Sequence, residues 1–156
     1  MDISTITEAF SDVTIQSPTV GVMLAGLLAV ALVFLSAFAS GSEIAFFSLS
    51  PSDVAELEDG KNPSDRKIQM LREDSERTLA TILITNNFVN VMIVMLLSNI
   101  FVSIVKFGPK AYWLEFLIMT VFLTFLLLLF GEIMPKVYCR QNPLRFCRRC
   151  VDAILF

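Results

Sequence analysis

Glu132 places a carboxylate at the end of a long apolar stretch, in the run Phe130-Gly131-Glu132-Ile133-Met134-Pro135-Lys136. An ionised group at membrane depth costs several kcal/mol, so carboxylates at such positions tend to be functional. Pro135 lacks the N–H that regular helical bonding needs, and Gly131 allows close approach of another group. This pattern favours a cation site inside a membrane. The alternative is a helix-end glutamate that reaches the cytoplasmic surface and pairs with Lys136.

Two other segments carry oxygen ligands at helical spacing. Ser36 and Ser40 are four residues apart, as are Asn86 and Asn90, so each pair lies on one helix face. Hydroxyl, amide and carboxylate oxygens are hard ligands that suit Mg2+, Ca2+ or Na+ and disfavour soft transition metals. We regard three neighbours as secondary candidates for the metal site or its surroundings: Ser42, Glu43 and Asn87.

Each of these residues also has a purely structural interpretation. Serines in membrane helices often bond to the carbonyl four residues earlier, and asparagines can join helices as hydrogen-bonding partners. Glu43 follows a glycine, so it could cap its helix or pair with nearby basic residues. A cation site is favoured because three separate segments bring polar groups to one depth.

The elements that must position these residues are three long apolar runs. Residues 13–42 and 78–105 contain no charge, and residues 111–131 contain only Glu115. A bilayer core requires about 20 consecutive apolar residues, which each run supplies. The first run lacks the positive flank of a signal peptide. The sequence therefore predicts an all-α membrane protein, with transmembrane helices at about 20–43, 78–105 and 111–135.

The basic residues predict how these helices are oriented. Lys106 and Lys110 lie between the second and third runs, and the other ten of the twelve Lys and Arg residues lie on the opposite side. The positive-inside rule makes that opposite side cytoplasmic, in the inner cell membrane. The amino-terminal segment 1–19 is then outside and the carboxyl terminus inside. Because the spans alternate in direction, the serines, asparagines and Glu132 meet at the cytoplasmic end.

Helices are also expected at the cytoplasmic membrane face. Residues 51–76 predict a helical hairpin that begins at Ser50-Pro51-Ser52-Asp53, turns at Gly60-Lys61-Asn62-Pro63 and resumes with Ser64 as the cap. Residues 139–156 predict an amphipathic juxtamembrane helix. Lys106-Phe107-Gly108-Pro109-Lys110 predicts an external turn.

The cysteines and the missing residue types bear on enzymatic functions. Cys139, Cys147 and Cys150 fall on the reducing side, so we expect no disulfide. Cys147 and Cys150 could form half of a zinc site, but packing within a short helix is the favoured interpretation. The chain contains no histidine, nucleotide-binding loop or nucleophile–base pair, so we expect neither an enzyme nor a nucleic-acid binder.

Three motifs occur in order along the chain: Ser40-Gly41-Ser42-Glu43, Ile84-Thr85-Asn86-Asn87-Phe88-Val89-Asn90 and Gly131-Glu132-Ile133-Met134-Pro135-Lys136. Together they resemble the transmembrane domain of the CorC/CNNM family, also called cyclin M or DUF21, whose members are Mg2+ transporters. We assign residues 20–138 to this domain. The resemblance implies a homodimer in membrane lipid, with a largely dehydrated Mg2+ site in each protomer. Carried onto this sequence, the ligands are Ser36, Ser40, Asn86, Asn90 and Glu132, with a backbone carbonyl near Gly131.

The resemblance also implies an activity. It implies export of Mg2+ by alternating access, coupled to Na+ entry. Family members continue into cytosolic CBS modules that bind ATP, so we expect this chain, which ends at Phe156, to stop ahead of them. A second hypothesis is a membrane Mg2+ sensor or scaffold that holds a structural cation and transports none.

Overall fold

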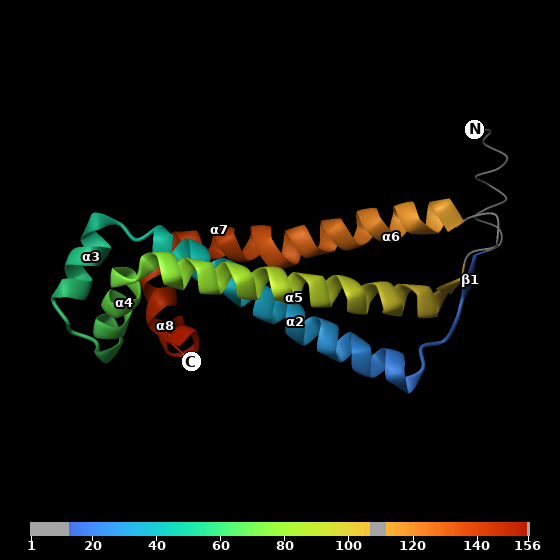
Figure 1. Cartoon of the computed structure of the whole chain (residues 1–156), viewed down its shortest axis with the longest axis horizontal. Coiled ribbons are helices and arrows are strands. Elements are labelled where there is room, and N and C mark those ends of the chain that lie inside the picture. The colour runs from blue at the N-terminus through green and yellow to red at the C-terminus, as the bar shows by residue number, and fades with distance from the viewer. Residues whose placement is uncertain (1–12, 107–111, 156) are drawn as a thin grey trace.

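The computed structural model describes residues 13–106 and 112–155, and its main feature is three long helices that lie side by side (Figure 1). Each is long and apolar enough to cross a membrane, as the sequence predicts. The protein is therefore an integral membrane protein of the all-α class. The three spans are α2 (Val20–Phe47), α5 (Ser75–Ile104) and the continuous run of α6 (Tyr112–Leu126), η1 (Leu127–Ile133) and α7 (Met134–Gln141). The segment 1–12 and most of the turn 106–110 lie outside the described residues.

The first span begins where Thr19 caps it, since the Thr19 side chain accepts a hydrogen bond from the Val22 N–H. It continues through Gly41 to Phe47, four residues beyond the predicted end at about 43. Gly41 lies within this helix at a close contact with the third span: a Cβ there would lie 2.6 Å from the sulfur of Cys139. The second span begins at Ser75, three residues ahead of the predicted start.

The third span does not end at Pro135, which corrects the prediction. The seven residues Leu127–Ile133 form a π-helix, and the Met134 N–H bonds to the Leu129 carbonyl five residues earlier. The wider turn lets Pro135 lie in the first turn of α7, where a missing N–H is tolerated. The helix then continues to Gln141.

Two short helices form the predicted hairpin at one end of the bundle. In α3 (Pro51–Glu58), Ser50 and Asp53 form a reciprocal capping box. Gly60 supplies the turn with a φ of 62°. The next helix, α4 (Pro63–Glu73), is capped by Asn62 and not by Ser64, because the Pro63 ring already fits the first helical position. We call this end of the bundle, where α3, α4 and α8 (Pro143–Leu155) lie, the hairpin end.

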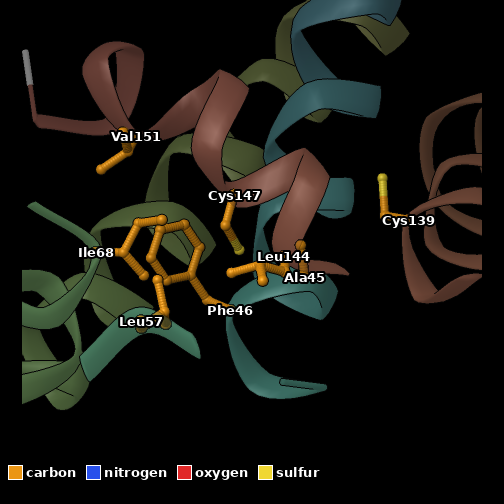
Figure 2. Packing of buried hydrophobic residues seen from close by; sticks show 8 residues of the cluster. All are labelled: Ala45, Phe46, Leu57, Ile68, Cys139, Leu144, Cys147 and Val151. Carbon is orange, nitrogen blue, oxygen red and sulfur yellow. The ribbon is translucent and has the colours of Figure 1, made fainter. Parts of the chain in front are cut away.

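An apolar core lies at the hairpin end, where the ends of the first and third spans meet the short helices. It joins α2, α3, α4, α7 and α8 through eight buried residues (Figure 2): Ala45, Phe46, Leu57, Ile68, Cys139, Leu144, Cys147 and Val151. A smaller cluster of Leu32, Val89 and Ile93 joins α2 to α5 at mid-span. Most large apolar residues elsewhere on the spans are exposed, as a lipid-facing surface requires.

A two-stranded sheet at the opposite end was not anticipated by the all-α prediction. β1 (Thr14–Ile15) pairs antiparallel with β2 (Val105–Lys106), and the Gln16 N–H bonds to the Ile104 carbonyl. Two residues per strand cannot fold alone. The pairing therefore serves to tie the segment ahead of the first span to the end of the second.

Candidate cation site

Ser36 and Ser40 lie on the face of α2 that is buried in the bundle, and both are fully shielded from solvent. They are one helical turn apart, as their spacing predicts. Ala37 and Ala39 have small side chains, which allow neighbouring helices to pack closely against this part of α2. The surface of α2 toward the hairpin end is thus a packed interface with hydroxyl groups inside it.

The Ser36 hydroxyl contacts the second span through two amide oxygens. Its Oγ lies 2.6 Å from the Oδ1 of Asn90 and 3.0 Å from the Oδ1 of Asn86. A hydroxyl has one proton, so it can donate to only one of these oxygens at a time. Two acceptor oxygens therefore compete for a single proton. Such an excess of acceptors is what a cation would relieve.

Gly131 brings the third span against the same hydroxyl. It is buried, and a Cβ on Gly131 would lie 3.1 Å from the Oγ of Ser36. A larger residue would push the serine or the helix aside. Pro135 offers no N–H to the Gly131 carbonyl four residues earlier, which leaves that carbonyl without its ordinary α-helical donor. The π-helix thus brings the backbone of the third span close to the Ser36 hydroxyl.

Glu132 is linked to these groups through Asn90. The Nδ2 of Asn90 donates to the Oε1 of Glu132 at 3.3 Å, and the carboxylate is partly buried. Lys136 does not pair with Glu132, since it forms a 3.2 Å ion pair with Glu43. The alternative in which Glu132 pairs with Lys136 therefore does not describe this structure. Glu43 takes the structural role that the sequence left open for it.

Ser40 has a buried hydroxyl one helical turn from Ser36. Its Oγ is buried and has no hydrogen-bond partner among the described residues. A buried polar atom without a partner costs free energy unless something else satisfies it. The residues present fit a small hard cation, because every candidate ligand atom is oxygen. Within residues 13–106 and 112–155, no group of three Cys, Asp or Glu residues could hold a metal.

Two secondary candidates point away from this cluster. The Ser42 hydroxyl donates to the carbonyl of Phe38 in its own helix at 2.7 Å. Asn87 is exposed, and its Nδ2 donates to the carbonyl of Leu83. The structural interpretation given for serines and asparagines in general applies to these two residues. Ser36, Asn86 and Asn90 instead bond between helices.

Sequence reasoning missed the π-helix that carries Gly131 and Glu132. The available signal was Pro135 behind an uninterrupted apolar run. A proline inside a helix needs a local change in hydrogen bonding, and a π turn is one such change. π-Helical turns occur frequently at functional sites.

Below the candidate site, an ionic clamp holds the hairpin end together. Arg148 on α8 donates to Asp65 at 2.8 Å and to Glu56 at 2.9 Å, and Asp65 is fully buried. The guanidinium of Arg148 holds the pKa of Asp65 below its ordinary value. Burial raises the pKa of Cys147 to about 12 and that of Cys150 to about 11, so both thiols are protonated at neutral pH. All three cysteines are buried packing residues in this structure.

Three apolar spans around a buried cluster of oxygen ligands define a polytopic membrane protein with a candidate site for a hard cation. Residues 27–156 match the model of the cyclin M transmembrane N-terminal domain. The chain therefore belongs to the cyclin M family, which confirms the resemblance carried by its three motifs.

Similarity to individual proteins agrees with this assignment. The chain is 30% identical over 127 residues to metal transporter cnnm-4 of Caenorhabditis elegans, an alignment that covers 78% of this chain and 26% of the worm protein. It is 36% identical over 129 residues to a putative chloroplastic DUF21 domain-containing protein of Arabidopsis thaliana, with 83% of this chain and 18% of that protein covered. A second such Arabidopsis protein is 35% identical. The chain thus spans about a quarter or less of the length of these relatives.

Proposed function

We propose that this chain is the membrane domain of a metal-ion transporter and that its cargo is Mg2+. The observation that carries the proposal is the buried Oγ of Ser40, which has no partner within the described residues, beside the oxygen cluster at Ser36. The name of the Caenorhabditis elegans relative, a metal transporter, supports metal transport as the activity. The all-oxygen ligand set favours Mg2+, Ca2+ or Na+ over softer metals.

The chain's own residues suggest how an ion would be held. Ser36, Ser40, Asn86 and Asn90 would supply neutral oxygens, and Glu132 the one full negative charge. A Mg2+ ion gives up its waters reluctantly, so a site with a single carboxylate binds it weakly. Weak binding suits a transporter, which must release its cargo. Partial exposure of Glu132 gives the carboxylate contact with the outside of the bundle.

Several finer features belong to the same proposal. We propose that the protein exports Mg2+ by alternating access coupled to Na+ entry, and that it acts as a homodimer. We place it in the inner cell membrane with the hairpin end in the cytoplasm, because ten of its twelve basic residues lie at that end. ATP-binding CBS modules are proposed as cytosolic partners of this domain.

Flux measurements in proteoliposomes test the proposal. Mg2+ flux is compared between the wild-type protein, Glu132→Gln and the control Glu115→Gln, which makes the same change near the other end of the third span. Losing a charge-assisted ligand should lower flux about tenfold or more in Glu132→Gln and leave the control unchanged. Equal flux in all three proteins would contradict the proposal. Mg2+-dependent thermal stabilisation without any flux would instead support a sensor or scaffold with a structural cation.

A further inference from the structure

A cavity of about 180 Å³ lies where α7 ends and α8 begins, away from the candidate cation site. It combines cationic and polar side chains with apolar ones, and no step of the proposed transport uses it. Its lining residues are Tyr138, Cys139, Asn142, Arg145, Phe146 and Arg149.

Two arginines at this cavity have no acidic partner among the described residues. Arg145 and Arg149 are four residues apart, so they lie on the same face of α8, and both are exposed. In the described part of the chain neither forms an ion pair or a side-chain hydrogen bond. Arg148 on the same helix behaves differently, since Asp65 and Glu56 bind its guanidinium. The cavity is therefore lined by two guanidinium groups that no described side chain neutralises.

The other side chains of the cavity place it at the edge of the membrane. The ring of Phe146 packs on Phe38 with centroids 6.3 Å apart, and both Phe146 and Cys139 contact Gly41 closely. Phe38 and Gly41 belong to the first membrane span, so the apolar part of the cavity adjoins the bilayer. Tyr138 is 72% exposed, and tyrosine is enriched where a membrane meets water.

We propose that this cavity binds the phosphate group of an acidic membrane phospholipid. Paired guanidinium groups match the oxygen atoms of a phosphate, to which arginine binds through two parallel N–H donors. The α8 helix packs Leu144, Cys147 and Val151 into the protein core and leaves Arg145 and Arg149 exposed, so the two guanidinium groups can reach an anionic ligand at the membrane surface. A soluble phosphate would use the arginines but would gain nothing from the apolar part of the cavity. The lipid is therefore the ligand that accounts for the whole lining.

Lipid retention measured by native mass spectrometry tests this inference. The wild-type protein is titrated with phosphatidylglycerol and, separately, with phosphatidylcholine. The test variant is Arg145→Gln/Arg149→Gln. The control variant is Arg66→Gln/Arg72→Gln, which removes two exposed arginines from α4 at the same end of the bundle. Far-UV circular dichroism verifies that both variants keep the helical content of the wild type.

The expected result is selective retention of phosphatidylglycerol by the wild type and the control. Each arginine removed from the cavity should weaken this retention about fivefold, so the test variant should lose about 25-fold. An equal loss in both double variants would overturn the inference, because general charge attraction would then explain binding. Release of the lipid by millimolar inorganic phosphate, with equal stabilisation by that phosphate alone, would also overturn it in favour of a free anion.

Discussion

The hydroxyl of Ser36 lies 2.6 Å from the amide oxygen of Asn90, which joins the first span to the second inside the bundle. The same hydroxyl lies 3.0 Å from Asn86. One serine thus contacts two residues on the second span and also adjoins Gly131 on the third. Ser36 is the point at which the three spans share a polar centre.

Replacing Ser36 by alanine should remove the response to Mg2+. The substitution removes the one hydroxyl donor that the two amide oxygens share, which should also lower the free energy of unfolding by about 1–3 kcal/mol. Thermal unfolding with and without Mg2+ measures both effects. Ser42→Ala is the matched control, because the Ser42 hydroxyl bonds only to a carbonyl of its own helix. An identical Mg2+ response in the two variants would show that Ser36 is not a ligand.

Gly131→Ala should weaken Mg2+ binding with little change in overall structure. The added Cβ would lie 3.1 Å from the Ser36 hydroxyl, so that hydroxyl must move by a few tenths of an ångström. Isothermal titration with Mg2+ measures the affinity. Gly26→Ala is the control, since a Cβ there meets nothing within 4 Å and should stabilise the helix by up to about 1 kcal/mol. Wild-type affinity in Gly131→Ala would argue against a site at this contact.

Gly41→Ala should destabilise the protein by about 1–3 kcal/mol through overpacking. Its Cβ would lie 2.6 Å from the sulfur of Cys139, a contact that side chains do not tolerate. The double variant Gly41→Ala/Cys139→Ala removes that sulfur and should recover part of the loss. Unfolding free energies of the two single variants and the double variant give the coupling. If the free-energy changes of the two single variants add up to that of the double variant, the strain does not come from the contact with Cys139.

Asp65→Asn should destabilise the hairpin end by about 3 kcal/mol, because it leaves the guanidinium of Arg148 without its buried partner. The folded-state pKa of Asp65 is lowered, so its contribution is complete above the unfolded pKa of about 3.9 and is lost as pH falls below that value. Thermal unfolding from pH 7 to about pH 3 should show this loss in the wild type and not in Asp65→Asn.

Asp59→Asn is the control for that experiment. Asp59 pairs with Lys61 on the exposed turn of the hairpin, where solvent screens the pair. The control should follow the pH profile of the wild type. A wild-type profile in Asp65→Asn as well would show that the clamp with Arg148 does not contribute to the acid response.

The three spans and the candidate ligands were predicted from different features of the sequence. Uncharged runs of bilayer length are sufficient to predict three helices, because lipid imposes a strong and local constraint. The i, i+4 spacing placed Ser36 with Ser40 and Asn86 with Asn90. An α-helix turns by about 100° per residue, so the one-residue offset of Asn87 and the two-residue offset of Ser42 direct these side chains elsewhere.

Long-range pairing could not be predicted in the same way. Lys136 has Glu132 four residues before it, yet it pairs with Glu43 from another helix. The path of the third span through Pro135 also depends on how η1 and α7 pack against α2. The length of an apolar run does not predict that packing. The positions of the helices could be predicted from short stretches of sequence. Which residues form ion pairs between helices depended on how the whole bundle is assembled.

The π-helix of Leu127–Ile133 changes the phase of the third span. It bonds across five residues where an α-helix bonds across four, so each of its turns holds more residues and the angular register slips. The side chains that face lipid on α6 consequently do not line up with those that face lipid on α7. The third span is two helices joined out of phase, and the joint is the segment that carries Gly131 and Glu132.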